Sequence, residues 1–222
     1  MEPVFTDTIT KSTTHYSVIN NVVGTPVLQK TPQSEVKRSA NRASYQTEDL
    51  YPIIDDLKMA HICFNQDGAP VSIPMLCWRV DNAIYIHGSR GSRLIKQLTN
   101  GNRSCVSFAE LNSWVMAKSA FHHSANYRSA VLFGQFEAIE DDELQLEIYQ
   151  HFVEQLEPGR WEQLRRPNEK EIKATTLLKM EINEGAVKIR TGGPIDDPGD
   201  LSLPVWAGEL PLIKQWGEKV EY

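Results

Sequence analysis

A short loop of glycine, serine and arginine, residues 88–92, has the composition of an anion-binding site. It follows the apolar segment 83–87 and precedes a second apolar segment, so it connects a predicted strand to a predicted helix. Free N–H groups and the positive end of the dipole at a helix N-terminus favour anions. Ser92 can cap the helix, Arg93 can bind a phosphate through two parallel hydrogen bonds, and Lys96 lies one turn later on the same side. A surface loop with solvated basic residues would have the same composition, so both interpretations stay open.

A second group of polar side chains, residues 118–129, separates two further predicted strands. Its density of hydrogen-bonding side chains is high for a connection, and ligand contacts gather in loops that a rigid barrel positions. His122 and His123 are candidate proton donors, although a rim histidine that bonds to the backbone accounts for each of them as well. Adjacent residues of an extended segment point to opposite faces, so this pair is badly placed to chelate one ion, and we expect no metal site.

The segment after residue 187 combines turn residues with aromatic side chains. Trp206 is followed by alanine and glycine, which lets a backbone approach its ring and suits either closure of the domain or stacking on a planar ligand. Asp196, Asp197 and Asp200 resemble part of a calcium loop, but the EF-hand spacing and its terminal glutamate are missing. We therefore interpret these acids as solvated turn residues.

Hydrophobic patterning predicts mostly strands between these segments. Apolar residues at helical spacing predict a helix that ends near Leu57 and begins either after a Thr47 cap or at Pro52. Asp67-Gly68 is a pair that closes tight hairpins. Strands are expected at 61–66, 71–80, 83–87, 103–110, 114–117, 129–139 and 175–182, and a second long helix at 141–156. Consecutive strands with short turns form an antiparallel meander, which suits a barrel.

The composition limits the classes of function. Of 222 residues, 41% are hydrophobic and 23% are charged, so we expect one globular domain at residues 46–222 after a polar arm at residues 1–45. A net charge of −6 without a basic block argues against nucleic-acid binding. No stretch approaches the ~20 apolar residues of a membrane span, and the first residues do not form a signal peptide, so we expect a cytoplasmic protein without a membrane segment. Cys63, Cys77 and Cys105 lie in apolar runs and are expected to be buried thiols.

Several specific strings occur in order along the chain. They are IYIHGSRGSRLIKQL, AKSAFHHSANYRSAVLFG, EPGRWEQLRRPNEKEIKATTLLKM, and KIRTGGPIDD followed by LPVWAGELPL. In order and spacing, these stretches are similar to the flavin-nucleotide-binding branch of the pyridoxamine 5′-phosphate oxidase-like family. The resemblance covers about residues 38–212, which is most of the chain.

The resemblance implies a mainly β fold with flanking helices (α+β), in which a six-stranded antiparallel split β-barrel of the FMN-binding type pairs as a homodimer. Two FMN sites would then lie at the subunit interface. It also implies that His87, at the end of a strand, belongs to the FMN site, and that Ser92, Arg93 and Lys96, which follow it, bind the FMN phosphate. The phosphate position agrees with the anion site inferred from the loop. It further places the backbone of Pro74, Met75 and Leu76 along the edge of the flavin ring. The rest of the flavin pocket would consist of Lys118, Ser119, Asn126, Tyr127, Arg128 and Ser129. Trp206, in a C-terminal tail that wraps around the domain, would reach the flavin of the partner subunit.

Two features depart from the family pattern. Many relatives have arginine where this chain has Lys118 and methionine where it has Ala125, and lysine cannot make the two-pronged contact of a guanidinium. The C-terminal Arg-x-His pattern of the strict oxidase is absent, so vitamin B6 oxidation is not expected. We interpret the chain as an FMN-dependent oxidoreductase with an unidentified small-molecule substrate. The alternatives are a flavin storage or sensing protein without turnover, and a haem-binding protein on the same barrel.

Overall fold

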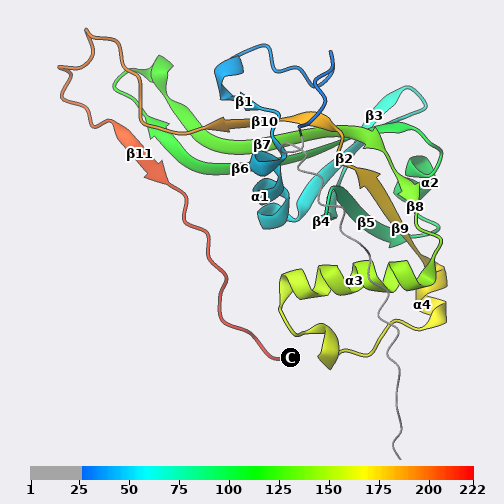
Figure 1. Cartoon of the computed structure of the whole chain (residues 1–222). Helices are drawn as coiled ribbons and strands as arrows, with labels where there is room; N and C mark the ends of the chain where they lie inside the picture. Colours follow the sequence, from blue (N-terminus) through cyan, green and yellow to red (C-terminus); the bar gives the residue numbers. More distant parts are fainter. Residues whose placement is uncertain (1–26) are drawn as a thin grey trace, which may run out of the picture.

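The computed structural model describes residues 27–222, in which two antiparallel sheets lie against one another (Figure 1). The larger sheet has the order β1 (Ala43–Ser44), β10 (Glu184–Arg190), β7 (Ser124–Gln135), β6 (Arg103–Met116), β2 (Met59–Gln66) and β3 (Ala69–Leu76), and β11 (Gly208–Pro211) pairs with β6. The smaller sheet has the order β4 (Trp78–Val80), β5 (Ala83–Ser89), β9 (Thr175–Glu181) and β8 (Glu137–Ala138). Helices lie beside both sheets, so the predicted mainly β class with flanking helices is confirmed.

The two sheets enclose one apolar core. The chain crosses from the larger to the smaller sheet at Cys77 and at Phe136, and both residues are buried. Ile62 and Leu132 from the larger sheet meet Ile86 from the smaller one, and all three have no exposed surface. Burial of such a side chain contributes roughly 1.5–3 kcal/mol to folding. This shared core holds the two sheets together as one unit.

The first helix, α1 (Thr47–Leu57), begins at Thr47, and its N-cap residue is Gln46. Thr47 is therefore inside the helix rather than its cap, and the helix does not start at Pro52. Pro52 lies within the helix and removes one backbone donor. Leu50 and Ile54 are fully buried on the helix face toward the core, and their burial offsets that loss.

The other helices follow their sequence signals. In α3 (Asp142–Leu156), the N-cap Asp141 accepts hydrogen bonds from the backbone N–H groups of Glu143 and Leu144 at 2.9 and 3.0 Å. This helix packs on the smaller sheet, where Ile148 is buried beside β4 and β5. The remaining helices are α2 (Arg93–Leu98) and α4 (Glu169–Ala174), with 3-10 turns at Ala40–Arg42, Ala120–His122 and Trp161–Gln163.

Two predicted strand boundaries on the β6–β7 hairpin were wrong. We expected two strands at 103–110 and 114–117, but β6 runs without interruption, because a register shift between Leu111 and Ser113 absorbs the irregularity. We also expected a loop up to residue 128, but β7 begins at Ser124. Pairing with β6 along nearly its whole length draws these polar residues into the sheet.

Two further boundaries were also wrong. The expected strand 71–80 is divided at Cys77 into β3 and β4, which belong to different sheets. The segment that we expected to begin a turn-rich tail forms β10, which pairs with β7 from Glu184 to Arg190. Local propensity does not show such long-range pairing, because the partner strand supplies both the hydrogen bonds and the packing.

The hairpin turn at Asp67-Gly68 is confirmed between β2 and β3. Asp67 and Gly68 have φ values of 52° and 84°, and positive φ at both central residues is the requirement of a type I′ turn. Asn65 accepts a hydrogen bond from the Gly68 N–H at 2.8 Å. β3 is the outer strand of its sheet and pairs with β2 alone, so one side of its backbone is free.

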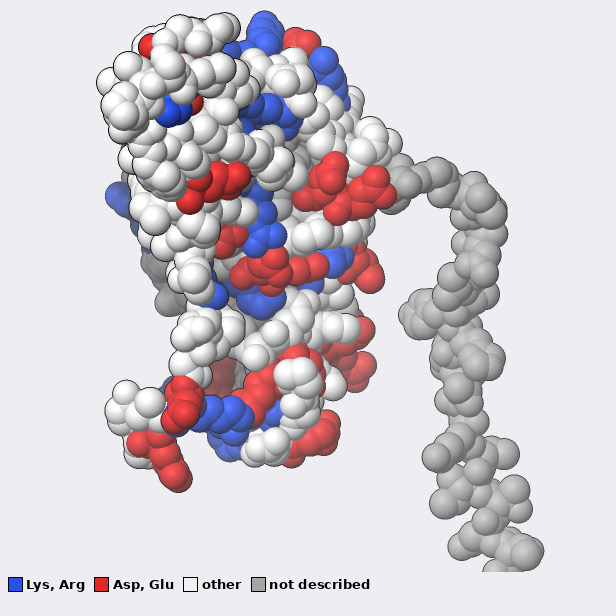
Figure 2. All heavy atoms as spheres, turned by 90° about the vertical axis from the view of Figure 1, so that its left-hand side faces the viewer, with Lys and Arg blue, Asp and Glu red and all other residues white. Residues whose placement is uncertain are grey.

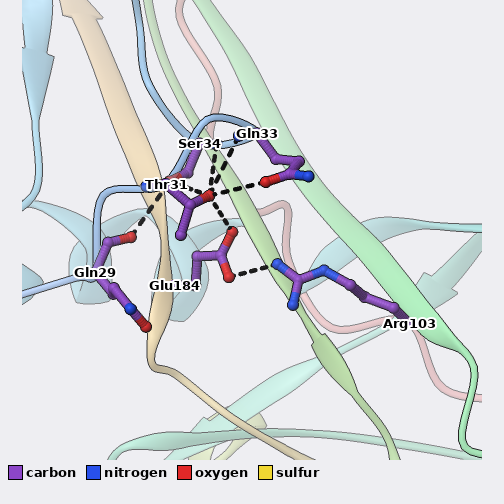
Figure 3. A network of polar contacts seen from close by, with 6 residues as sticks. All are labelled: Gln29, Thr31, Gln33, Ser34, Arg103 and Glu184. Atoms are coloured by element: carbon purple, nitrogen blue, oxygen red, sulfur yellow. Dashed lines mark hydrogen bonds and ion pairs between the residues drawn. The ribbon is translucent and has the colours of Figure 1, made fainter.

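The described part of the expected N-terminal arm, residues 27–45, packs on the larger sheet. Leu28 is buried in the core, and Figure 3 shows the polar contacts that follow it. Glu184 is buried and its carboxylate is shared between the Thr31 hydroxyl at 2.6 Å and the Arg103 guanidinium. Burial would raise the pKa of Glu184, but the hydrogen bonds from Arg103 and Thr31 hold it below its usual value. A division of the chain at residue 45 stays a prediction, and residues 1–26 of the expected arm lie outside the described part.

The cysteines differ in burial. Cys77 is fully buried, as expected, but Cys63 and Cys105 are half-buried and lie opposite one another across β2 and β6.

On the face shown in Figure 2, acidic and basic side chains are interspersed. Within residues 27–222, no helix combines the length and apolarity that a membrane span needs.

Candidate functional site

The segment of residues 88–92 leads from β5 into α2, as the sequence predicts, but β5 continues to Ser89, two residues beyond its predicted end, so the loop itself is residues 90–92. Ser92 is the N-cap of α2, and its hydroxyl oxygen accepts a hydrogen bond from the Ile95 N–H at 3.3 Å. Its hydroxyl proton is therefore free to be donated. A side chain at Gly88 would come within 3.2 Å of Ile95, so glycine allows α2 to lie close against β5.

Arg93 and Lys96 lie on the exposed side of α2. Neither side chain forms a hydrogen bond or an ion pair with any residue from 27 to 222. The opposite side of the helix is buried through Leu94 and Leu98, so packing fixes which side the two cations occupy. Two unpaired cations beside a free hydroxyl donor fit a phosphate group. Because α2 has only six residues, we assign the attraction to these side chains and not to a helix dipole.

The structure places His87 apart from this group. Side chains alternate along β5, so Ile86 and Gly88 point toward the core and α2, whereas His87 points toward α3. The His87 ring lies 5.7 Å from the Tyr149 ring in an edge-to-face arrangement. Burial lowers the pKa of His87, so the imidazole is neutral at neutral pH.

Lys118 and His122 connect the β6–β7 hairpin to the loop that precedes β11, whereas His123 bonds within the hairpin connection. The Lys118 ammonium donates hydrogen bonds to the carbonyl oxygens of Leu203 and Val205 at 2.6 and 2.9 Å. His123 donates from Nδ1 to the Ser119 carbonyl at 2.9 Å, which is the contact expected of a rim histidine, and the His122 ring lies 3.3 Å from Asp197. The Ser119 hydroxyl is buried and has no partner in the described chain.

The residues from Asn126 to Ser129 lie on β7, where most of their polar groups already have partners. Asn126 is buried and bonded at both ends of its amide. The Arg128 guanidinium donates to Glu110 at 2.6 Å and to Asp56 at 2.7 Å, and the Ser129 hydroxyl donates to the Lys188 carbonyl. The hydroxyl of half-buried Tyr127 bonds to no described residue, so it is available to a ligand.

Pro74, Met75 and Leu76 lie on the free edge of β3. Pro74 and Leu76 are exposed, whereas Met75 packs against the core. Trp206 is also exposed, and its ring lies over Gly208, where a Cβ atom would come within 3.1 Å of it. The predicted residues thus fall into three groups: the loop with α2, the β6–β7 hairpin with its covering loop, and the edge of β3.

Comparison with known proteins identifies the family. Residues 46–189, more than half of the chain, match the family described as pyridoxamine 5′-phosphate oxidase. The chain belongs to this family. None of the curated proteins matches the chain.

Two relatives with solved structures resemble this chain over most of its length. A flavocytochrome from Azotobacter vinelandii is 35% identical, with a TM-score of 0.82 over 86% of this chain and 89% of that chain. An FAD- and haem-binding protein from Mycobacterium smegmatis is 34% identical, with a TM-score of 0.78 over 82% of this chain and 89% of that chain. A putative 5-nitroimidazole antibiotic resistance protein from Bacteroides thetaiotaomicron shares the fold, with 17% identity and a TM-score of 0.55. The split-barrel fold of the pyridoxamine 5′-phosphate oxidase family is thereby confirmed.

Sequence reasoning missed several residues around the predicted ones. Arg190 and Glu209, the hydrogen-bond partners of Asn126, come from strands that we did not expect. Tyr149 and Phe152, which lie beside His87, belong to the segment 141–156, for which the sequence predicts only a helix. Their spacing of three residues was the signal for a shared helix face, but nothing in it indicated which strand that face covers. In the described part of this family member, no three histidine, cysteine or acidic side chains lie together as a metal site would require.

Proposed function

We propose that this protein binds a flavin nucleotide and carries out redox chemistry with it, with the nucleotide's phosphate at the 88–92 loop. The observation that carries the proposal is the pair Arg93 and Lys96, which is exposed on one side of α2 and has no partner in residues 27–222. Such cations form charge-assisted hydrogen bonds with phosphate, and Ser92 can add a neutral donor. Membership of the family supports this assignment.

FMN is the nucleotide that the sequence resemblance implies, and the relative from M. smegmatis is described as binding FAD. Both nucleotides carry a phosphate on the ribityl chain, and that is the group that Arg93 and Lys96 would hold. The proposal therefore covers FMN and FAD, and extraction of the bound nucleotide distinguishes them.

The flavin ring would lie between the free edge of β3 and the β6–β7 hairpin. At the β3 edge, backbone groups near Pro74 and Leu76 face away from β2 and can bond to the polar edge of the ring. The hydroxyls of Ser119 and Tyr127 have no partner in the described chain, so each can complete a hydrogen bond to a ligand. When bound, the flavin would supply one- and two-electron redox chemistry, while these residues hold and orient it.

We also propose that the protein is a homodimer with a flavin at each side of the subunit boundary. Pro74, Leu76 and Trp206 are apolar and exposed in the single chain, and a partner subunit would cover them. A two-fold dimer uses the same surface on both subunits, so each flavin would have the same surroundings.

Haem is the second cofactor of this proposal. The two relatives with 35% and 34% identity are described as a flavocytochrome and as a protein that binds FAD and haem. The sequence resemblance also allowed a haem-binding protein as an alternative to a flavoprotein. These relatives favour the binding of haem in addition to flavin, and not instead of flavin.

An absorbance spectrum of the purified full-length protein tests the proposal. We expect flavin bands, a Soret band after addition of hemin, and FMN or FAD in the extract. Bleaching by NADH or NADPH and reoxidation by an acceptor would support turnover, whereas a flavin that no donor reduces would indicate storage or sensing. A colourless protein whose apo form takes up neither FMN nor FAD would contradict the proposal.

A further inference from the structure

A cavity lies on the opposite side of β5 from the 88–92 loop. It has a volume of about 340 Å³ and is lined mainly by apolar and aromatic side chains from α3 and from the segment 161–172. Tyr149, Phe152 and Trp161 form its aromatic part, and His87 lies at its inner end. Pockets for small molecules are typically ~300–1,000 Å³, apolar, and equipped with a few polar groups. The cavity has these properties, and of the residues assigned to the flavin from the sequence only His87 lines it.

His87 is the polar group at the inner end of this cavity, and neither of its ring nitrogens bonds to a described residue. Nδ1 is buried without a hydrogen-bond partner, and Nε2 has none in residues 27–222. Three aromatic rings hold the imidazole in place, at centroid distances of 5.7 Å for Trp78 and Tyr149 and 6.3 Å for Phe152. Nδ1 is too closely surrounded to meet a ligand, whereas the unpaired Nε2 is not buried, so Nε2 is the nitrogen that a ligand in the cavity can reach.

Two more polar groups near His87 also lack partners. The Trp78 indole N–H and the Tyr149 hydroxyl are buried, and no described residue bonds to either of them. Burial raises the pKa of Tyr149 to about 12, so its hydroxyl stays protonated. Burial also keeps His87 neutral, and a neutral imidazole has the free lone pair that a metal ion requires.

The walls and the imidazole together select the chemical class of the ligand. Aromatic and aliphatic walls favour a flat, apolar molecule, and a rigidly held neutral imidazole is a ligand for a metal centre. A metal ion alone does not fit, because no three metal-binding side chains lie together in the described chain. A metal that brings its own equatorial ligands, as haem does, needs only one imidazole from the protein.

We propose that this cavity is the haem site and that His87 supplies the axial nitrogen to the haem iron. The inference rests on the proposed function, and it adds the location and the protein ligand of the second cofactor. His87 and Ser92 are separated by five positions, at most roughly 18 Å of extended chain. The two cofactors would therefore lie close together on opposite faces of β5.

The mouth of the cavity carries an arginine, which suits the propionate groups of haem. Arg165 and Glu171 both line it and form an ion pair at 2.8 Å. The Arg165 side chain is largely exposed, so it can exchange Glu171 for a propionate carboxylate of haem. Since the cavity is small for a porphyrin, the propionate edge would remain at this mouth, beside Arg165. The short helices η3 (Trp161–Gln163) and α4 form this wall and would move outward on binding.

Hemin titration of the full-length protein, followed at the Soret band, tests the inference. The variant is His87→Ala, which should bind hemin at least tenfold more weakly and shift or lose the band. His151→Ala on α3 and His61→Ala on β2 are the controls, because both histidines are exposed and neither lines the cavity. Thermal unfolding of each variant checks that it folds.

A second variant separates iron ligation from a structural role. In His87→Gly, added imidazole should enter the space left by the side chain and restore the Soret band of the parent. If the parent binds hemin and His87→Ala keeps its spectrum and affinity, or if His61→Ala loses the band instead, the assignment of His87 is overturned. If the parent binds flavin but no hemin, the haem part of the proposed function fails, and this inference fails with it.

Discussion

The guanidinium of Arg190 donates a hydrogen bond to the side-chain carbonyl of Asn126, and both side chains are buried. Asn126 in turn donates to the Ser113 hydroxyl at 2.9 Å and to the Glu209 carboxylate at 2.6 Å. Arg190 also donates to the carbonyl oxygens of Gly192 and Gly193. This network joins β6, β7, β10 and β11, so one amide connects an arginine and a glutamate that do not bond to each other directly.

Asn126→Ala should destabilise the protein by about 2–3 kcal/mol, because it removes the hydrogen bonds that join the amide to the buried Arg190, to Glu209 and to Ser113. Urea unfolding measures this change. Ser129→Ala is the matched control on the same strand, since it removes one hydrogen bond to the Lys188 carbonyl and should cost about 1 kcal/mol or less. Equal losses in the two variants would show that the network does not depend on Asn126.

Arg93→Ala should weaken FMN or FAD binding by ~2–4 kcal/mol, because it removes a charge-assisted hydrogen bond to the phosphate. At ~1.4 kcal/mol per tenfold change, this is about a thirty- to thousand-fold increase in Kd. Arg93→Lys should recover only part of the loss, since a point charge does not reproduce the planar fork. Titration of the apo-protein, followed by flavin fluorescence, measures each Kd.

Riboflavin and a neighbouring arginine are the controls for that experiment. Riboflavin lacks the phosphate, so it should bind weakly and be almost indifferent to Arg93→Ala. Arg90→Ala changes a residue of the same loop that has no assigned contact, and it should leave the Kd of FMN within about threefold, a change of ~0.7 kcal/mol. A similar loss for FMN and riboflavin on Arg93→Ala would mean that Arg93 is structural.

Cys77 should make the stability of the protein depend on pH in the alkaline range. Burial raises the pKa of its thiol above the value of 9.0 that applies to an exposed thiol. Above pH 9 the unfolded chain therefore loses this proton while the folded chain keeps it, so the free energy of unfolding falls as pH rises, by about 1.4 kcal/mol per pH unit. Denaturant unfolding between pH 8 and about 10.5 measures the slope.

Cys77→Ala should remove that contribution, so its stability should fall less steeply with pH than that of the parent. Cys105→Ala should flatten the slope in a similar way within this range, because burial raises the pKa of Cys105 to about 11. Identical slopes in the parent and in Cys77→Ala would show that the Cys77 thiolate forms readily in the folded state.

The homodimer is tested by light scattering. The chain has a mass of 25.2 kDa, and we expect about twice this value at micromolar concentration. Trp206→Ala should shift the equilibrium toward monomer if this exposed ring contacts the partner subunit. A parent protein that stays monomeric would contradict the proposed position of the flavin between subunits.

Local chemistry was enough to predict several parts of the molecule. The Asp67-Gly68 turn follows from two residues that tolerate positive φ, and α3 follows from its amphipathic period and its acidic first turn. The loop between β5 and α2 and the cap at Ser92 were also predicted correctly. Each of these signals is contained in fewer than about 20 consecutive residues, so no distant partner is needed to interpret it.

Tertiary structure decided which polar residues have partners and which faces they occupy. The sequence by itself determined that His87 lies near the end of a strand and precedes the 88–92 loop, but packing of α3 turned its ring toward a separate cavity. The sequence likewise placed Asn126 among polar residues, while pairing of β7 with β6 and β10 buried it. The physical reason is that a strand residue has two faces, and only the elements that cover the sheet determine which face is core, which is surface and which lines a site.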